Sequence, residues 1–235
     1  MRRRNPELGM IELWCRLRQR GYTRRPESLY RVMRRLGMFP QKKTKKPYVP
    51  KPYEQMTYPG QRVQIDVKHV PAACLVGEVK GQRFYQYTAI DEYSRLRYLE
   101  AFEEANTYSS ATLLKNAAAF FANQGFSVER VRTDNGSEFT SRFNNSKREL
   151  PSLFEITTDQ LGIRRSLIRP YTPRHNGKVE RSHREDNKRF YRQRSFFSFD
   201  DFAKQLSAHL KRSNNMPMRP LRFNSTLDFL AVHYV

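Results

Sequence analysis

The sequence predicts a mixed α/β fold in which a five-stranded sheet is covered by helices. Apolar and polar residues alternate between residues 61 and 103, an amphipathic helical pattern follows, and two further strand-like runs then alternate with helices. Consecutive strands followed by alternating helices and strands are typical of a mixed sheet with helices packed on it.

Residues 6–39 have the apolar period of two short helices, separated at Gly21. The second run, RPESLYRVMRRLG, has Ser28 near its start and Gly37 at its end, as a capped helix would. Two short helices joined by a turn, the second rich in arginine, predict a helix-turn-helix-like segment over residues 1–40 that contacts DNA. An ordinary helical hairpin would have the same pattern.

Residues 41–60 are rich in lysine and proline and contain almost no aliphatic side chain. This composition predicts an extended basic linker, whose lysines either contact phosphates or are simply solvated. The sheet domain is then expected over residues 61–215, and residues 216–235 are expected to form a C-terminal tail.

Five runs predict the strands of the sheet. In the first, RVQIDVKHV, the valines and the isoleucine lie on one face and the polar residues lie on the other. QRFYQYTAID and RLRYLEAF follow, joined by the turn-forming tetrad DEYS, and VERVRT and GIRRSLI complete the set. The covering helices are an amphipathic one that ends at Gly125, a long basic one over about 174–194 and another over about 200–212.

The charge of the chain indicates a polyanionic partner. There are 44 Lys and Arg against 23 Asp and Glu, a formal net charge of +21, and the basic residues are spread along the whole sequence. Such charge opposes compact folding unless a polyanion binds, and nucleic acid rewards a long basic track. A ribosomal or structural nucleic-acid binder would share this balance, so charge alone does not name an activity.

The two cysteines, Cys15 and Cys74, are far apart and form no CxxC pair. A disulfide framework and a Cys-rich zinc site are therefore not expected, whereas a reducing, intracellular setting is. No run approaches the ~18 apolar residues of a membrane span, and the N-terminus has no apolar core of a signal peptide. We expect a cytoplasmic protein with no membrane partner.

Three acidic residues form a candidate metal site. Asp66 interrupts the first strand, Asp134 ends the fourth in TDNGSEF, and Glu180 falls in the first turns of a helix that follows the Asn176–Gly177 pair. If they converge on one sheet edge, they can bind hard divalent cations, which take oxygen ligands. Singly, each has an ordinary explanation: Asp134 can cap the turn that follows it, and the other two can be structural.

Four motifs, QIDVKHV, IDEYSR, TDNGSEF and PYTPRHNGKVER, occur in this order within residues 60–215. In this combination the chain resembles the integrase catalytic core of bacterial insertion-sequence transposases, a family related to the retroviral integrases. The resemblance implies an RNase H-like fold and a D, D, E triad that binds two Mg²⁺ or Mn²⁺ ions. By position, Asp66 and Asp134 would be the aspartates and Glu180 the glutamate, with Asp66 bridging the two ions.

The resemblance also implies the surroundings of this triad. The positions that match the family's active-site surroundings are Asn135, Gly136, His175, Asn176 and Lys178. The residues expected to contact DNA are Lys178, Arg181, His175, Asn176 and Arg184. For the basic residues among them, a solvated helix face is the alternative.

Two features depart from the family pattern. Asp134 and Glu180 are separated by 45 residues, more than is usual in the family. We place the surplus in SRFNNSKRELPSLFEIT, as a loop or extra turn at the surface, where added length costs on the order of 0.6 kcal/mol per doubling. Many relatives also carry more DNA-binding sequence before the position of residue 1, so a fragment or a decayed element is an alternative to a complete enzyme.

The implied activity is that of a DNA transposase or integrase. Water attacks a phosphodiester to free a 3′-OH at a transposon end, and this hydroxyl then attacks the target DNA. Joining two ends implies a homo-oligomer assembled on DNA, in a bacterial protein associated with the nucleoid. The alternatives are an RNase H-like nuclease without strand transfer and a catalytically inactive, domesticated DNA-binding protein. The intact acidic triad argues against the last, since a decayed site is free to lose its acids.

Other residues have less specific explanations. Asp91 could compete for the metal, but a turn-capping role with Ser94 and Arg95 is favoured. Glu138 is either close to the site or merely exposed. The phenylalanines within residues 196–202 are expected to pack in a core, with a base-stacking platform as the alternative. The histidines have no zinc-ligand spacing.

Overall fold

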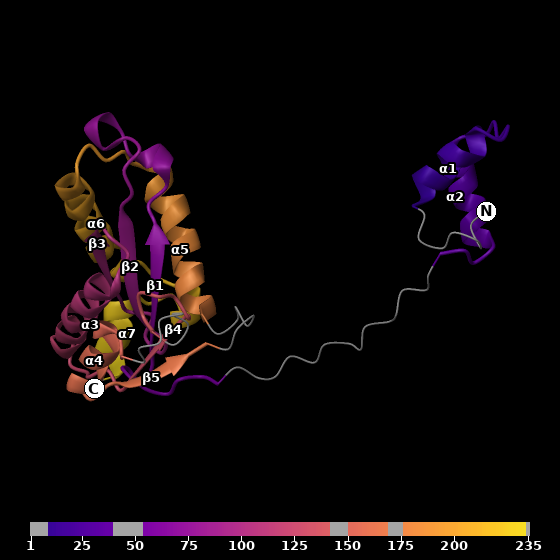
Figure 1. The fold of residues 1–235 in the computed structure, drawn as a ribbon. Coiled ribbons are helices and arrows are strands. Elements are labelled where there is room, and N and C mark those ends of the chain that lie inside the picture. Colours follow the sequence, from indigo (N-terminus) through magenta and orange to yellow (C-terminus); the bar gives the residue numbers. More distant parts are fainter. Residues whose placement is uncertain (1–8, 40–53, 142–149, 169–175, 234–235) are drawn as a thin grey trace. The chain divides into compact units, whose positions relative to one another are not determined.

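A computed structural model of the chain describes residues 9–39, 54–141, 150–168 and 176–233. Two compact units, Met1–Tyr53 and Glu54–Val235, make up the chain, and both are drawn in Figure 1. Within the described residues, no helix is both long enough and apolar enough to cross a membrane.

The N-terminal unit is a pair of helices, α1 (Met10–Arg18) and α2 (Pro26–Arg35). Pro26 opens α2, where its missing N–H is not needed, and Gly37 follows the helix with a φ of 62°. The buried residues that join the two helices are Leu13, Leu29 and Met33. The predicted helix pair is confirmed, and its contact with DNA stays a prediction.

The second unit contains the predicted five-stranded mixed sheet. Its strands are β1 (Val63–His69), β2 (Tyr85–Asp91), β3 (Arg97–Phe102), β4 (Arg130–Thr133) and β5 (Arg164–Leu167). They are ordered β3-β2-β1-β4-β5. β2 pairs antiparallel with both β1 and β3, whereas β4 pairs parallel with both β1 and β5. β1 is therefore the central strand.

The pairing of β1 with β4 fixes the relation of the two predicted aspartates. Val63 is opposite Val131, and Gln64 is opposite Arg132. The same offset, carried further along both strands, brings Asp66 level with Asp134. Because side chains alternate between the faces of a sheet, both aspartates lie on the face opposite to Val63 and Val131.

The sheet is the middle of three layers. One face carries an apolar core with α3 (Thr107–Ala122), α4 (Leu153–Gln160) and α7 (Thr226–His233), which contribute Leu113, Phe154 and Leu230 among others. The other face carries α5 (Gly177–Arg189) and α6 (Phe199–Asn214). The second apolar core lies between β3 and α6 and includes Leu99, Phe202 and Leu206. Figure 1 shows α5 alongside β1.

Short polar signals set the helix starts. Asn106 caps α3 by accepting a hydrogen bond from the Ser109 backbone N–H, and Ser198 caps α6 in the same way through Asp201. α4 begins with a full capping box between Ser152 and Glu155.

The structure changes several predicted boundaries. Residues from Glu54 onward belong to the second unit rather than to a linker, and Met56 is buried there. The expected C-terminal tail contains α7, held to the core by Leu230. In the expected surface insertion, α4 forms the last part, while residues 142–149 lie outside the described residues.

The long basic helix is shorter than predicted. It ends at Arg189, because the chain turns at Phe190 so that Phe190 and Tyr191 pack into the second core. Of the phenylalanines expected in a core, Phe196 and Phe202 are completely buried, whereas Phe197 is 66% exposed.

Candidate active site

Asp66 is half-buried on the face of β1 that α5 covers. Its Oδ1 accepts a hydrogen bond of 3.0 Å from the backbone N–H of Val67. Burial raises the pKa of Asp66 to about 7, and the negative charges of Asp134, Glu180 and Glu138 add to this effect. The structure therefore brings Asp134, Glu180 and Glu138 each close enough to Asp66 for their charges to act on its carboxyl group.

Asp134 follows β4 at the start of a tight turn. Its Oδ1 accepts a hydrogen bond of 3.0 Å from the N–H of Gly136, so Asp134 also caps the turn, as its ordinary explanation holds. A Cβ atom at Gly136 would lie 2.5 Å from Oε2 of Glu138, so a larger residue there would have to displace the end of this carboxylate side chain. Asn135 ties the turn to the end of β5 by donating to the carbonyl of Ile168 at 3.2 Å.

Glu180 is exposed in the first turn of α5. The start of this helix is anchored to the central strand, because the buried Val179 donates its backbone N–H to Oε1 of Gln64 at 3.0 Å. Gln64 lies two residues before Asp66 on the same face of β1. The anchor therefore explains why Glu180 lies beside a strand residue more than a hundred positions away.

The acids are close, but they are not in a ligating arrangement. Within the ranges that the structure describes, no three His, Cys, Asp or Glu side chains are placed so that they could hold a metal ion as they stand. Glu180 is exposed at the surface of α5. An all-oxygen donor set whose charges already repel is suited to Mg²⁺ or Mn²⁺, so the residues fit the predicted ions.

Lys178 lies in a buried ion cluster instead of on an open helix face. Its Nζ donates to the carbonyl oxygen of Glu92 at 2.7 Å and is 3.3 Å from the Glu92 carboxylate. Glu92 also pairs with the buried Arg62, at 2.5 Å. Burial, together with the neighbouring arginine Arg95, lowers the pKa of Lys178 to about 8. The cluster fastens the first turn of α5 to the β2–β3 turn, so Lys178 has a structural role.

The other predicted DNA contacts differ in their exposure. Asn176 is only 3% exposed, so its side chain lies inside the protein. Its position directly before α5 does not predict this burial. Arg181 and Arg184 are exposed on α5, and their contact with DNA stays a prediction. His175 lies outside the described residues.

His183 is a residue of the site that the sequence reasoning missed. Its Nδ1 lies 3.5 Å from Oδ2 of Asp66, and its Nε2 lies 3.0 Å from Oγ1 of Thr88. The Thr88 hydroxyl accepts a hydrogen bond from Gln86, so its own hydrogen can be donated to Nε2. A neutral His183 ring that accepts this bond carries its proton on Nδ1, the nitrogen nearer to Asp66. The available signal was the position of His183, one helical turn after Glu180.

A buried polar network continues from this histidine under α5. Gln86 also donates to Oδ2 of Asp186 at 2.9 Å, and Asp186 accepts from Arg97 at 2.8 and 3.0 Å and from His209 at 2.8 Å. Burial alone would raise the pKa of Asp186, but the Arg97 guanidinium holds it well below its usual range. Burial lowers the pKa of His183 to about 4, so its imidazole is neutral near pH 7.

The turn-capping role of Asp91 is confirmed. Its Oδ2 accepts hydrogen bonds of 2.7 Å from both the backbone N–H and the hydroxyl of Ser94, and its Oδ1 accepts one from Gly60. Arg95 completes the corner with a φ of 65°. Both carboxylate oxygens of Asp91 are thus occupied, which removes it as a rival metal ligand.

Comparisons with known proteins agree with this geometry. Residues 57–173 match one family described as integrase core domain, and residues 161–216 match a second family with the same description. The chain is 31% identical over 133 residues to "Putative integrase ORF3" of Spiroplasma virus SpV1-C74. The aligned region covers 54% of this chain and 35% of the viral protein. The match thus spans about a third of the viral protein's length.

Solved structures confirm the predicted fold. The chain is similar to a protein of the simian T-cell lymphotropic virus intasome bound to the PP2A regulatory subunit B56 gamma (17% identity, TM-score 0.54, 85% of this chain and 64% of the other). It is also similar to the HTLV-2 integrase catalytic core domain in complex with magnesium (15% identity, TM-score 0.51, covering 73% of this chain and 96% of the other). A third similar structure is the catalytic core domain of BIV integrase (20% identity, TM-score 0.50, covering 74% of this chain and 96% of the other). At these identities the likeness concerns the fold.

Proposed function

The chain belongs to the integrase core domain family, and on that premise we propose that it is a D,D,E transposase or integrase acting on DNA. In this proposal it cleaves a DNA strand to free a 3′-OH and transfers that end to a second DNA. The observation that carries the proposal is the proximity of Asp134 and Glu180 to Asp66, since their negative charges add to the burial that raises the pKa of Asp66.

Each residue has a distinct role in the proposed site. Asp66, Asp134 and Glu180 would hold two divalent ions. When bound, such ions stabilise the charge that develops on the attacking and leaving oxygens of a phosphodiester. His183 would orient the Asp66 carboxylate through its Nδ1–H. The exposed Arg181 and Arg184 would hold the phosphates of the substrate.

A strand-transfer assay distinguishes the three candidate activities. Labelled duplexes that carry the repeats flanking the gene would be incubated with the protein and Mg²⁺ or Mn²⁺. Joined products would support the transposase or integrase. Cleavage without joining would instead identify an RNase H-like nuclease, and binding without either would identify an inactive DNA-binding protein.

Metal binding should stabilise the protein more strongly at higher pH. The folded-state pKa of Asp66 is raised from 3.8 to about 7, so folding favours its protonated form. The stability that this group contributes is complete below pH 3.8 and is lost as the pH rises through about 7. A divalent ion must displace the proton, so MgCl₂ should raise the melting temperature more above pH 7 than at pH 5 to 6.

Thermal unfolding with and without MgCl₂ measures this effect. Asp66→Asn should abolish the pH-dependent part of the increase, since an amide does not titrate in this range. An equal increase in Asp66→Asn and in the unmodified protein would contradict binding at this carboxylate.

Replacement of His183 by Ala should weaken catalysis without removing it. Partners that orient a metal ligand typically contribute about 10- to 100-fold in metal affinity or activity. We therefore expect His183→Ala to require more Mn²⁺ or Mg²⁺ for half-maximal cleavage. His183→Asn should show a smaller increase in the metal requirement, because its amide N–H can still donate to Asp66. His233→Ala, which removes an exposed histidine at the end of α7 on the other face of the sheet, is the matched control. An unchanged metal requirement in His183→Ala would exclude this orienting role.

A further inference from the structure

An open groove of about 790 Å³ lies near the C-terminal end of α5, beyond the acidic cluster. Its basic residues are Arg184 and Lys188 on α5 and Arg192 and Arg194 after the helix. Small side chains of the segment after β1, including Pro71 and Ala73, also line the groove, together with the buried Cys74 and Tyr191. We call this the distal groove.

The walls of the distal groove are joined to each other by hydrogen bonds. The Cys74 thiol donates to the carbonyl of Tyr191 at 3.2 Å, and the backbones of Cys74 and Phe196 are joined at 2.7 Å. Val76 donates to the carbonyl of Phe196 at 3.1 Å. α5 forms one wall of the groove, and its Asp186 joins the helix to the sheet by accepting hydrogen bonds from Arg97 and Gln86. The groove is thus part of the folded framework.

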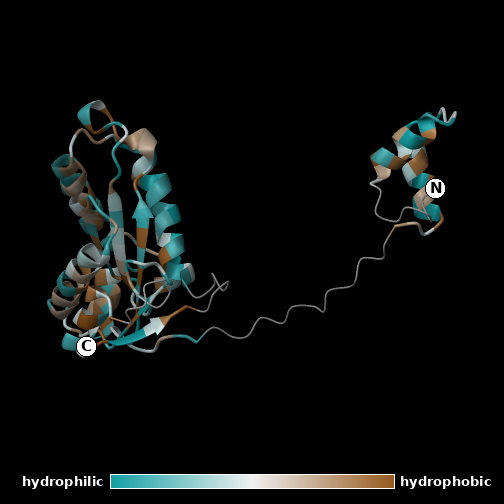
Figure 2. Ribbon diagram, in the orientation of Figure 1, coloured by the Kyte–Doolittle hydropathy of each residue, from teal (hydrophilic) through white to brown (hydrophobic). Residues whose placement is uncertain are grey.

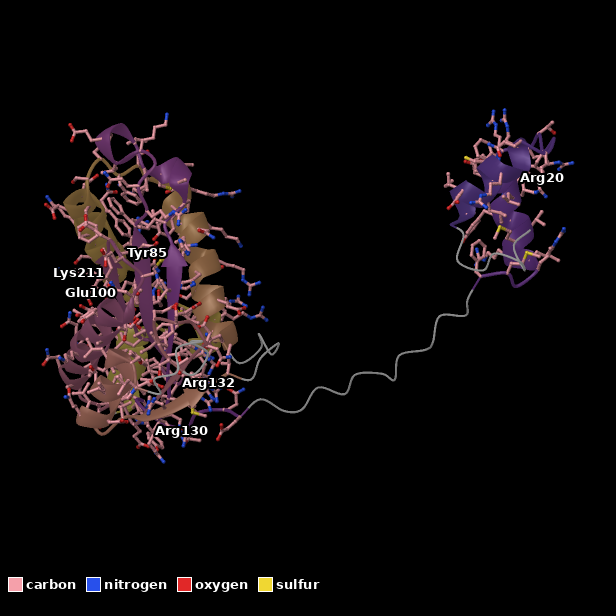
Figure 3. All side chains as sticks on the ribbon, in the orientation of Figure 1. Arg20, Tyr85, Glu100, Arg130, Arg132 and Lys211 are labelled. Atoms are coloured by element: carbon pink, nitrogen blue, oxygen red, sulfur yellow. The ribbon has the colours of Figure 1, made fainter. Side chains whose placement is uncertain are left out.

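The groove has a strong excess of positive charge. All four cations are exposed, and the single ion pair among them in the described residues joins Lys188 to Glu185 at 4.0 Å. Four cations on one groove with so little internal neutralisation favour a polyanionic occupant. Figure 2 shows α5 as hydrophilic over most of its length, and Figure 3 shows nitrogen-tipped side chains along its outer side.

The groove continues the helix face that begins at the acidic cluster. Glu180, Arg184 and Lys188 are four residues apart and therefore follow one another along one side of α5. At about 1.5 Å per residue, Lys188 lies ~12 Å beyond Glu180. This distance corresponds to roughly three to four base pairs along a duplex at ~3.4 Å each.

We propose that the distal groove binds the sugar–phosphate backbone of the substrate DNA, beginning about three to four base pairs from the bond that is cleaved. This inference rests on the proposed function and adds a second binding site to it. Lys188, Arg192 and Arg194 contact successive phosphates, and Pro71 and Ala73 offer a small apolar wall to the deoxyribose. The groove positions the duplex without reading its sequence, since phosphate contacts carry no base information.

The test is a binding measurement on the full chain without divalent ions. The variant Lys188→Ala/Arg192→Ala/Arg194→Ala is compared with the unmodified protein on a fluorescein-labelled duplex over a series of salt concentrations. Each lost phosphate contact lowers the slope of log Kd against log salt by about 0.9, so the expected decrease is about 2 to 3. The matched control, Lys115→Ala/Lys204→Ala/Lys211→Ala, removes three exposed charges from α3 and α6 and should change the slope by less than about 1.

A decrease no larger than that of the control would overturn the proposal. The proposal would also be overturned if the groove variant lost affinity for single-stranded RNA but kept its full affinity for duplex DNA. All three residues of the groove variant are exposed, and an unchanged melting temperature verifies that it folds.

A second measurement separates the groove from the catalytic proposal. With metal present, the groove variant should cleave a duplex that ends within about three base pairs of the cleaved bond as well as the unmodified protein does, and a longer duplex less well. Equal loss on both duplexes would overturn the groove assignment. Absence of cleavage by the unmodified protein would instead contradict the proposed function, while the salt dependence would still decide whether the groove binds DNA.

Discussion

Replacement of Asp66 by Asn is expected to abolish metal-dependent cleavage and strand transfer while leaving DNA binding nearly intact. Asp66 is central among the acids, with its pKa raised to about 7 by burial and by their charges. Loss of its negative charge removes the position where a divalent ion is best stabilised. We expect a decrease of at least about a thousandfold in rate, equivalent to about 4 kcal/mol of transition-state stabilisation.

The experiment combines a cleavage assay with a binding titration in salt. Binding should persist because it depends on lysines and arginines that the variant retains. Asp200→Asn, which removes an exposed carboxylate in the first turn of α6, is the matched control and should retain activity. If Asp66→Asn lost binding and cooperative unfolding together with cleavage, Asp66 would be a structural residue instead.

Replacement of Asp186 by Ala is expected to cause the largest loss of stability. Asp186 is completely buried and accepts hydrogen bonds from Arg97, His209 and Gln86. The variant leaves the buried Arg97 guanidinium without its carboxylate, and breaking a buried pair in this way costs about 3–5 kcal/mol. Urea denaturation followed by circular dichroism would measure the change in the free energy of unfolding.

The neighbouring residue on α5 gives a matched control. Glu185 forms an exposed ion pair with Arg189 at 3.0 Å, and pairs of this kind contribute about 0.2–1 kcal/mol. Glu185→Ala should therefore change stability by less than about 1 kcal/mol. Similar losses for the two variants would mean that the buried network does not hold α5 on the sheet.

The sheet was accessible from the sequence because alternation reports directly on burial. In β1, Val63 and Ile65 face the apolar core, and Asp66 lies on the opposite face, as the period of two requires. The triad was accessible for a different reason: its surrounding motifs resemble a known family. Periodicity alone does not show that β1 and β4 pair in parallel with an offset that aligns Asp66 with Asp134.

Residues whose roles depend on distant partners were harder to predict. Lys178 looks like a surface cation in sequence, yet Glu92, 86 positions away, draws it into a buried cluster. The role of His183 is equally hard to predict, because its partners Asp66 and Thr88 lie on two different strands. Charge and spacing along a helix do not reveal which residues of other elements lie beneath it.

Two predicted boundaries were wrong where a short apolar group packs against a distant part of the chain. α7 lies in the segment predicted as a tail, but Leu230 and Leu227 pack it against the first core. The long basic helix was extended too far, since its pattern of charges continues past Arg189 while the chain already turns inwards at Phe190. Both errors reflect packing that a single amphipathic pattern does not encode.

The parallel register of β1 and β4 makes the site vulnerable to a change that alters no acidic residue. A slip of one position between these strands would turn Asp134 away from α5 and towards the apolar core on the other face of the sheet, because each step along a strand reverses the side-chain direction. Added or deleted residues in the connection between the strands are absorbed easily, whereas one added inside β4 would separate the aspartates. The length of a four-residue strand is thus under tighter constraint than the length of the loops around it.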